Sequence, residues 1–104
     1  MTPETVTLPS SLSIRGINAI HETLLSAFQE SSAVVLDMPE DASVDLSFVQ
    51  LVESSRLYAR EQGKFITLKK PAGQGVVETL GRAGFLENMD EASRLFWLHG
   101  KEIQ

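Results

Sequence analysis

Two aspartates, Asp37 and Asp45, flank a short loop in the first half of the chain, and paired carboxylates of this kind can carry acid–base chemistry. Asp37 follows the apolar run 33–36, which is typical of a strand covered on both faces. Asp45 precedes an amphipathic run, where its carboxylate can accept a backbone N–H as a helix N-cap. The loop between them also contains Glu40 and Asp41, so it is acidic and solvated, without the burial that catalytic carboxylates require. We therefore interpret Asp37 as a strand end and Asp45 as a helix cap.

The two histidines, His21 and His99, are the only imidazoles available for catalysis or metal binding. His21 adjoins an apolar helical stripe, which favours a partly buried structural histidine over a catalytic base, and His99 is expected to be solvated. Neither has a neighbour at metal-ligand spacing, and the chain has no cysteine. No metal site and no cofactor are therefore expected.

A glycine pair at 73–75, Gly-Gln-Gly, precedes a predicted helix and invites comparison with phosphate-binding turns. The known fingerprints need a third glycine or a Gly-Lys-Ser/Thr ending, whereas Val-Val-Glu follows here. Because Glu78 would repel a phosphate, we interpret the pair as a flexible strand-to-helix turn.

A small enzyme or receiver using Asp37 is a further hypothesis. Asp37 and the Lys-Lys-Pro segment at 69–71 resemble the phospho-acceptor and Lys-Pro elements of response-regulator receiver domains. Receiver chemistry also needs a magnesium-binding acidic pair after the first strand, and Leu-Pro-Ser occupies positions 8–10. We therefore expect a protein that is not an enzyme.

Composition limits the other classes of function. One hundred and four residues, 42% of them hydrophobic, suit one domain spanning 1–104. The net charge of −5 and the scattered basic residues exclude a nucleic-acid footprint. No apolar run exceeds four residues and no signal segment opens the chain, so we expect a cytoplasmic protein with no direct membrane insertion.

The periodicity alternates between strand and helix. Strands are predicted at 5–8, 33–36 and 64–68, with a possible re-entry at 12–14; helices are predicted from about 15 to 28, from 45 to a stop at Gly63, and from 76 to a stop at Gly84. The tail 90–98 fits a helix or a strand, and the acids at its start favour the helix. This order predicts an α/β fold: a small, mostly parallel sheet of about four strands, with three to four helices packed against it.

Segments along most of the chain resemble one known family, the STAS domain of bacterial anti-sigma-factor antagonists. The matching segments are Leu-Pro-Ser-Ser-Leu-Ser-Ile (8–14), Val-Val-Leu-Asp (34–37), Asp-Leu-Ser-Phe-Val (45–49), Gly-Lys-Phe-Ile-Thr-Leu (63–68) and Leu-Gly-Arg-Ala-Gly-Phe (80–85). The resemblance implies a single STAS-like domain.

The resemblance also identifies a regulatory position. In the family, a partner kinase phosphorylates the first serine after the signature aspartate and thereby switches binding off. That position here is Leu46, which has no hydroxyl group; Ser47 matches the second hydroxyl position, and Phe48 replaces a glycine. Ser47 is a candidate for phosphorylation because a helix N-terminus favours a phosphate, although Asp45 opposes the charge; an unmodified helix-start serine is the alternative.

The function implied is a non-enzymatic protein-interaction module in bacterial signal transduction. Its partner would be an anti-sigma factor or a chemotaxis-type histidine kinase, bound through the loop 38–44 and the helix start. The predicted partner-binding residues are Asp41, Asp45, Leu46, Ser47 and Phe48, and Phe48 is either an aromatic anchor or a core residue. An alternative is a small cytoplasmic STAS-like subunit of a membrane transport assembly.

Overall fold

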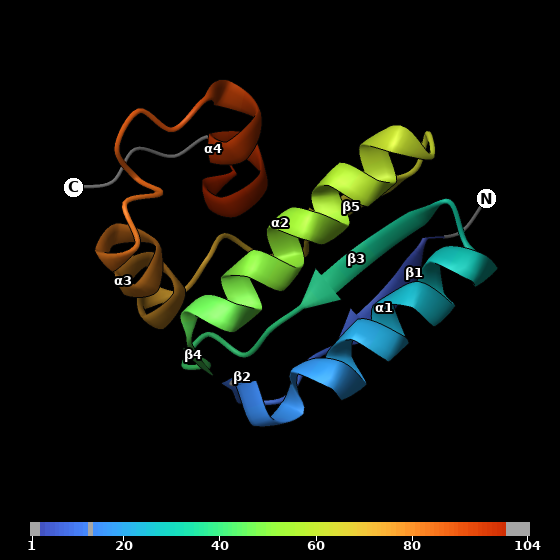
Figure 1. The fold of residues 1–104 in the computed structure, drawn as a ribbon, viewed down its shortest axis with the longest axis horizontal. Helices are drawn as coiled ribbons and strands as arrows, with labels where there is room; N and C mark the ends of the chain where they lie inside the picture. The colour runs from blue at the N-terminus through green and yellow to red at the C-terminus, as the bar shows by residue number, and fades with distance from the viewer. Residues whose placement is uncertain (1–2, 13, 100–104) are drawn as a thin grey trace.

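The protein, in a computed structural model, is described over residues 3–12 and 14–99 (Figure 1). Its elements in chain order are β1 (Glu4–Thr7), β2 (Ser11–Leu12), a 3-10 helix η1 (Ile14–Gly16), α1 (Ile17–Glu30), β3 (Ala33–Asp37), β4 (Ser43–Val44), α2 (Leu46–Glu61), β5 (Phe65–Leu68), α3 (Gln74–Arg82) and α4 (Glu91–Leu98). In the predicted strand re-entry at 12–14, Leu12 lies in β2, position 13 lies outside the described residues, and Ile14 begins η1.

The main sheet has the order β1-β3-β5, and both of its strand pairs are parallel. A second, two-stranded parallel sheet joins β2 to β4. Helix α1 lies along β1 and α2 lies along β5 (Figure 1). The predicted α/β class, with a small and mostly parallel sheet and four helices in the described part of the chain, is confirmed.

The main sheet buries one face. Val6, Leu36 and Leu68 are neighbours across the three strands, and all three are buried. On the other face, Val35 is half-buried between two exposed threonines. The expectation that the strand at 33–36 is covered on both faces is wrong. Right-handed crossovers that run in one direction, from β1 to β3 to β5, place α1 and α2 on the same side of the sheet.

Helix ends follow the sequence signals closely. Asp45 caps α2, and Gly63, just after that helix, has a φ of 67°, which a residue without a Cβ adopts readily. The tail at 91–98 is a helix, as favoured, and the Asp90 carboxylate accepts the Ser93 N–H at 2.8 Å. The same N–H and the Ser93 hydroxyl hold the pKa of the Asp90 carboxyl below its usual value. Helix α3 ends at Arg82, and Ala83, the residue after it, is exposed.

Helix α4 is fastened to α2 by one arginine and one glutamate. The Arg56 guanidinium donates to Glu53 Oε2 at 2.7 Å and to the Ser93 hydroxyl at 3.1 Å, and it lies 4.8 Å from the centre of the Phe96 ring. Glu53 Oε2 also accepts the indole N–H of Trp97 at 3.3 Å. The contact extends the core, because the Trp97 side chain has no accessible surface. Within the described ranges, no helix combines the length and apolar content needed to cross a membrane.

Candidate functional site

Three of the predicted binding residues, Asp45, Leu46 and Ser47, lie where α2 begins, and Asp41 lies in the loop before it. We call these four residues the α2-start surface. Asp45 Oδ1 accepts the backbone N–H of Ser47 at 3.1 Å and that of Phe48 at 3.4 Å. The Ser47 hydroxyl donates to the same oxygen. One carboxylate thus caps the helix and orients the serine, which confirms the predicted cap.

The accessibility of these residues divides them by role. Asp41 is exposed, and Leu46 is 42% exposed although its side chain is apolar. Asp45 and Ser47 are half-buried. Phe48 is fully buried in the hydrophobic core, so in this structure it has the core role and is not an exposed aromatic anchor. Leu46 is therefore the residue of this surface that can offer an apolar side chain to a partner.

The loop before α2 is held by hydrogen bonds on both sides. The Ser43 N–H donates to the Ser10 carbonyl at 2.8 Å, and the Asp45 N–H donates to the Leu12 carbonyl at 3.2 Å. From α3, the Thr79 hydroxyl lies 3.3 Å from the Val44 carbonyl oxygen and 3.0 Å from that of Gly75, so it shares its one proton between the loop and its own helix. These bonds fix the entry into α2, so the surface is formed before any partner arrives.

The glycine pair at 73–75 packs against the same loop. A Cβ on Gly73 would lie 2.3 Å from the Glu40 carbonyl oxygen, and one on Gly75 would lie 2.7 Å from that of Ala42. Gly73 has an ordinary φ of −74°, so the glycine is needed for space rather than for conformation. The predicted turn is present. Because its glycines have no Cβ, the start of α3 can pack directly against the backbone of the loop.

The two aspartates that open the question of catalysis have different partners. The Asp37 carboxylate lies 3.6 Å from Lys69 Nζ at the ends of β3 and β5, while Asp45 caps α2. No group of three metal-ligating side chains occurs among the described residues. Asp37 therefore forms an ion pair with Lys69 at the strand ends, and Asp45 acts as a helix cap.

The two histidines lie on different elements. His21 is exposed on α1, where it borders a cavity of about 100 Å³ between α1 and α2, so the partial burial expected for it is wrong. His99 is exposed, as expected, and its Nε2 lies 3.0 Å from the Leu68 carbonyl oxygen.

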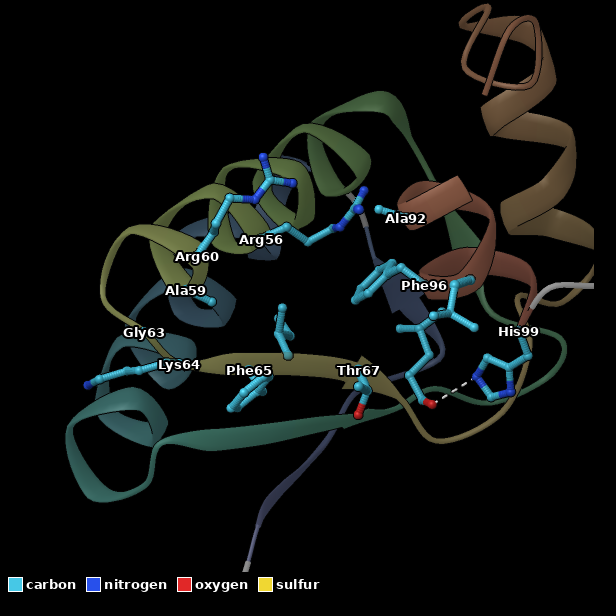
Figure 2. Close-up of a pocket in the computed structure, with 13 residues that line it drawn as sticks. Arg56, Ala59, Arg60, Gly63, Lys64, Phe65, Thr67, Ala92, Phe96 and His99 are labelled. Carbon is cyan, nitrogen blue, oxygen red and sulfur yellow. Dashed lines mark hydrogen bonds between the residues drawn. The ribbon is translucent and has the colours of Figure 1, made fainter. Parts of the chain in front are cut away.

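Sequence reasoning missed one concave feature of the described structure. A groove of about 880 Å³ lies between the second half of α2, strand β5 and α4 (Figure 2). We call it the β5 groove; its lining comes from α2 and the turn after it (56–63), from 64–68, and from α4 and the residue after it (92–99). A signal was present in the sequence, because no strand pattern separates the third helix from the fourth, so β5 is left at the edge of the sheet.

Comparison of the chain with protein-family models, curated proteins and solved structures found no match. The STAS resemblance therefore rests on the residue patterns alone.

Proposed function

We propose that this chain is a non-enzymatic, STAS-like interaction module of bacterial signal transduction. In this proposal the α2-start surface docks an anti-sigma factor or a histidine-kinase-like protein. The observation that carries the proposal is the exposed Leu46 on a helix start that hydrogen bonds already hold in place.

The fixed geometry of the loop supports binding through a lower entropic cost. A loop that orders only on binding loses conformational freedom at that moment, at a cost of about 1–2 kcal/mol for each backbone residue fixed. Here the β2–β4 pair, the Thr79 hydroxyl and the close approach of Gly73 position the loop in the free chain. More of the contact energy then remains for affinity.

The charges in the loop before α2 favour a basic partner. Glu40 and Asp41 are exposed in this loop, in a chain whose net charge is −5. Such acids speed association with a positively charged surface and exclude acidic competitors, while the apolar Leu46 side chain supplies burial.

The same geometry gives a reason why the phosphorylation switch of the STAS family would be missing here. Leu46 cannot carry a phosphate, and the Ser47 hydroxyl is already bound to the carboxylate that caps the helix. A phosphate on Ser47 would place its negative charges beside Asp45 and disturb that cap. We propose that binding at this surface is constitutive when Ser47 is unmodified.

Affinity capture with a charge-introducing variant tests the proposal. Wild-type chain, Leu46→Glu and the control Leu57→Glu are used as baits in an extract of the native host. Leu57 is 53% exposed and lies further along α2. An acidic residue in the first turn of a helix is well tolerated, so the Leu46 variant should fold.

We expect wild type and the Leu57 variant to retain an anti-sigma factor or a histidine-kinase-like protein. Leu46→Glu should retain at least tenfold less of that partner than wild type. Equal retention by all three baits rejects this surface as the docking site. Retention of a membrane ATPase in place of the kinase-like protein supports the transport-assembly alternative.

A further inference from the structure

Strand β5 lies at the edge of the main sheet, and its outer edge pairs with no other strand of the described residues. The N–H of Phe65 in β5 and that of Lys69, the residue after this strand, donate on the side of β3, to the carbonyls of Ser32 and Leu36, each at 2.8 Å. Because the backbone direction alternates along a strand, Ile66 and Leu68 turn their N–H and C=O groups to the opposite side. There β5 has no strand neighbour in the described part of the chain, and this side faces the β5 groove.

The groove also contains the most exposed large apolar side chains of the described residues. Phe65 is 69% exposed and Leu95 is 65% exposed, and they come from β5 and α4, on different walls of the groove. Exposed apolar side chains beside an open strand edge are a hazard for aggregation unless something covers them.

The charge of the groove opposes the charge of the whole chain. The ionisable residues that line it are Arg56, Arg60, Lys64 and His99, and no described carboxylate lines it. The chain as a whole has fourteen acids against nine lysines and arginines. Arg60 is exposed, whereas Arg56 is held by Glu53 and Ser93, and the Lys64 ammonium donates to the Phe28 carbonyl. The positive charge that a partner meets here is chiefly that of Arg60.

We propose that the β5 groove binds an extended acidic segment of a partner protein, which adds as a strand to the outer edge of β5. The Ile66 N–H and C=O would form the ladder, and apolar side chains at alternate positions of the segment would contact Phe65 and Leu95. Acidic side chains would pair with Arg60. The contact between His99 and the Leu68 carbonyl marks the end of the ladder (Figure 2).

A second copy of the chain fits this edge less well. Two strands that pair across a two-fold axis place the same surface of each copy against the other. Arg60 and Lys64 would then lie opposite the same basic residues, without carboxylates in the groove to separate them. Charge therefore favours an acidic segment from another protein.

The groove is separate from the α2-start surface and does not depend on it. Arg60 follows Leu46 by fourteen residues of one helix, which at 1.5 Å per residue places them about 20 Å apart along its axis. A result at one surface can thus be distinguished from a result at the other.

Selection from a displayed library of random ten-residue peptides tests the proposal with the full chain as target. We expect enriched peptides to carry net negative charge, to alternate apolar and polar residues and to lack proline. Their binding should fall at least tenfold with Arg60→Glu and with the double variant Phe65→Thr, Leu95→Ser. The controls Arg82→Glu and Leu57→Ser change equivalent exposed residues outside the groove and should bind as wild type.

Amide hydrogen exchange identifies the atoms involved. An enriched peptide, at ten times its Kd, should slow exchange of the Ile66 amide about tenfold by occupancy. It should slow the Phe65 amide, already bonded to Ser32, no more than the other amides that exchange only on unfolding. Failure to enrich any peptide, enrichment of basic peptides, or an Ile66 amide unaffected by the bound peptide each overturns the proposal. Slowing of Ile66 exchange with protein concentration alone, matched by dimer in sedimentation, also overturns it in favour of a second copy.

Discussion

At the scale of single residues, Asp45 has the most concentrated set of contacts on the α2-start surface. One of its carboxylate oxygens accepts two backbone N–H groups and the Ser47 hydroxyl. Helix N-termini leave such N–H groups without partners within the helix, so a capping oxygen stabilises the helix while it orients the neighbouring side chain. Structural and binding effects of this residue can be separated by substitution.

Removal of the cap should lower stability by a predictable amount. We expect Asp45→Ala to reduce the free energy of unfolding by about 1 kcal/mol, and Asp45→Asn, which keeps a capping oxygen, to cost less. Urea denaturation followed by circular dichroism measures the change. Asp41→Ala, in the exposed part of the loop, is the control and should lie within about 0.5 kcal/mol of wild type. A loss for Asp41→Ala as large as that for Asp45→Ala would contradict the capping role.

At the scale of elements, the strands and helices follow from local chemistry, and their tertiary contacts do not. The cap at Asp45, the stop at Gly63 and the helix at 91–98 depend on side chains within a few residues, and all three were predictable. The β2–β4 pair consists of two residues on each strand, too short for any periodic pattern. The burial of Phe48 was also undecided, because a residue in a first helical turn can face either the core or the solvent.

The glycine pair shows what the sequence could not reveal about the site. Gly-Gln-Gly marks a turn in any sequence, but only the fold brings Gly73 against the Glu40 carbonyl. The β5 groove has the same origin, since its lining comes from three segments far apart in the chain. Phe65 and Leu95 are exposed in a fold whose described residues place no strand beside the outer edge of β5, which is a property of the sheet as a whole.

The contact between α3 and the loop predicts an asymmetry between glycines. Gly73→Ala should reduce the free energy of unfolding by about 1–3 kcal/mol, because its Cβ would meet a backbone oxygen that cannot move independently. Gly16→Ala is the matched control: its Cβ would have no neighbour within 4 Å, and the expected change is below about 1 kcal/mol. Thermal or urea unfolding gives both free energies. Equal losses of stability would show that the loop moves to make room for the added Cβ at position 73.

At the scale of the whole molecule, the described residues form one sheet layer and one main helical layer, with α4 added at the side of β5 (Figure 1). Both α1 and α2 lie on one face, so the core depends on a single interface between layers. Helix α4 joins that core through Trp97 and through Arg56, which links α2 to the start and the middle of α4. Burial of Trp97 makes α4 part of the same hydrophobic core.

Coupling of α4 to the rest of the chain can be measured, because Trp97 is the single tryptophan. It has no accessible surface, so its fluorescence reports the docking of α4, while far-ultraviolet circular dichroism reports all helices. If the chain is one cooperative domain, the two urea transitions should share a midpoint and a slope of about 1–3 kcal/mol per molar. Glu53→Gln, which weakens the bonds to Arg56 and Trp97, should move both midpoints downward together. A fluorescence transition at lower urea than the circular dichroism transition would show that α4 separates before the sheet unfolds, and the β5 groove would then lose one wall under mild conditions.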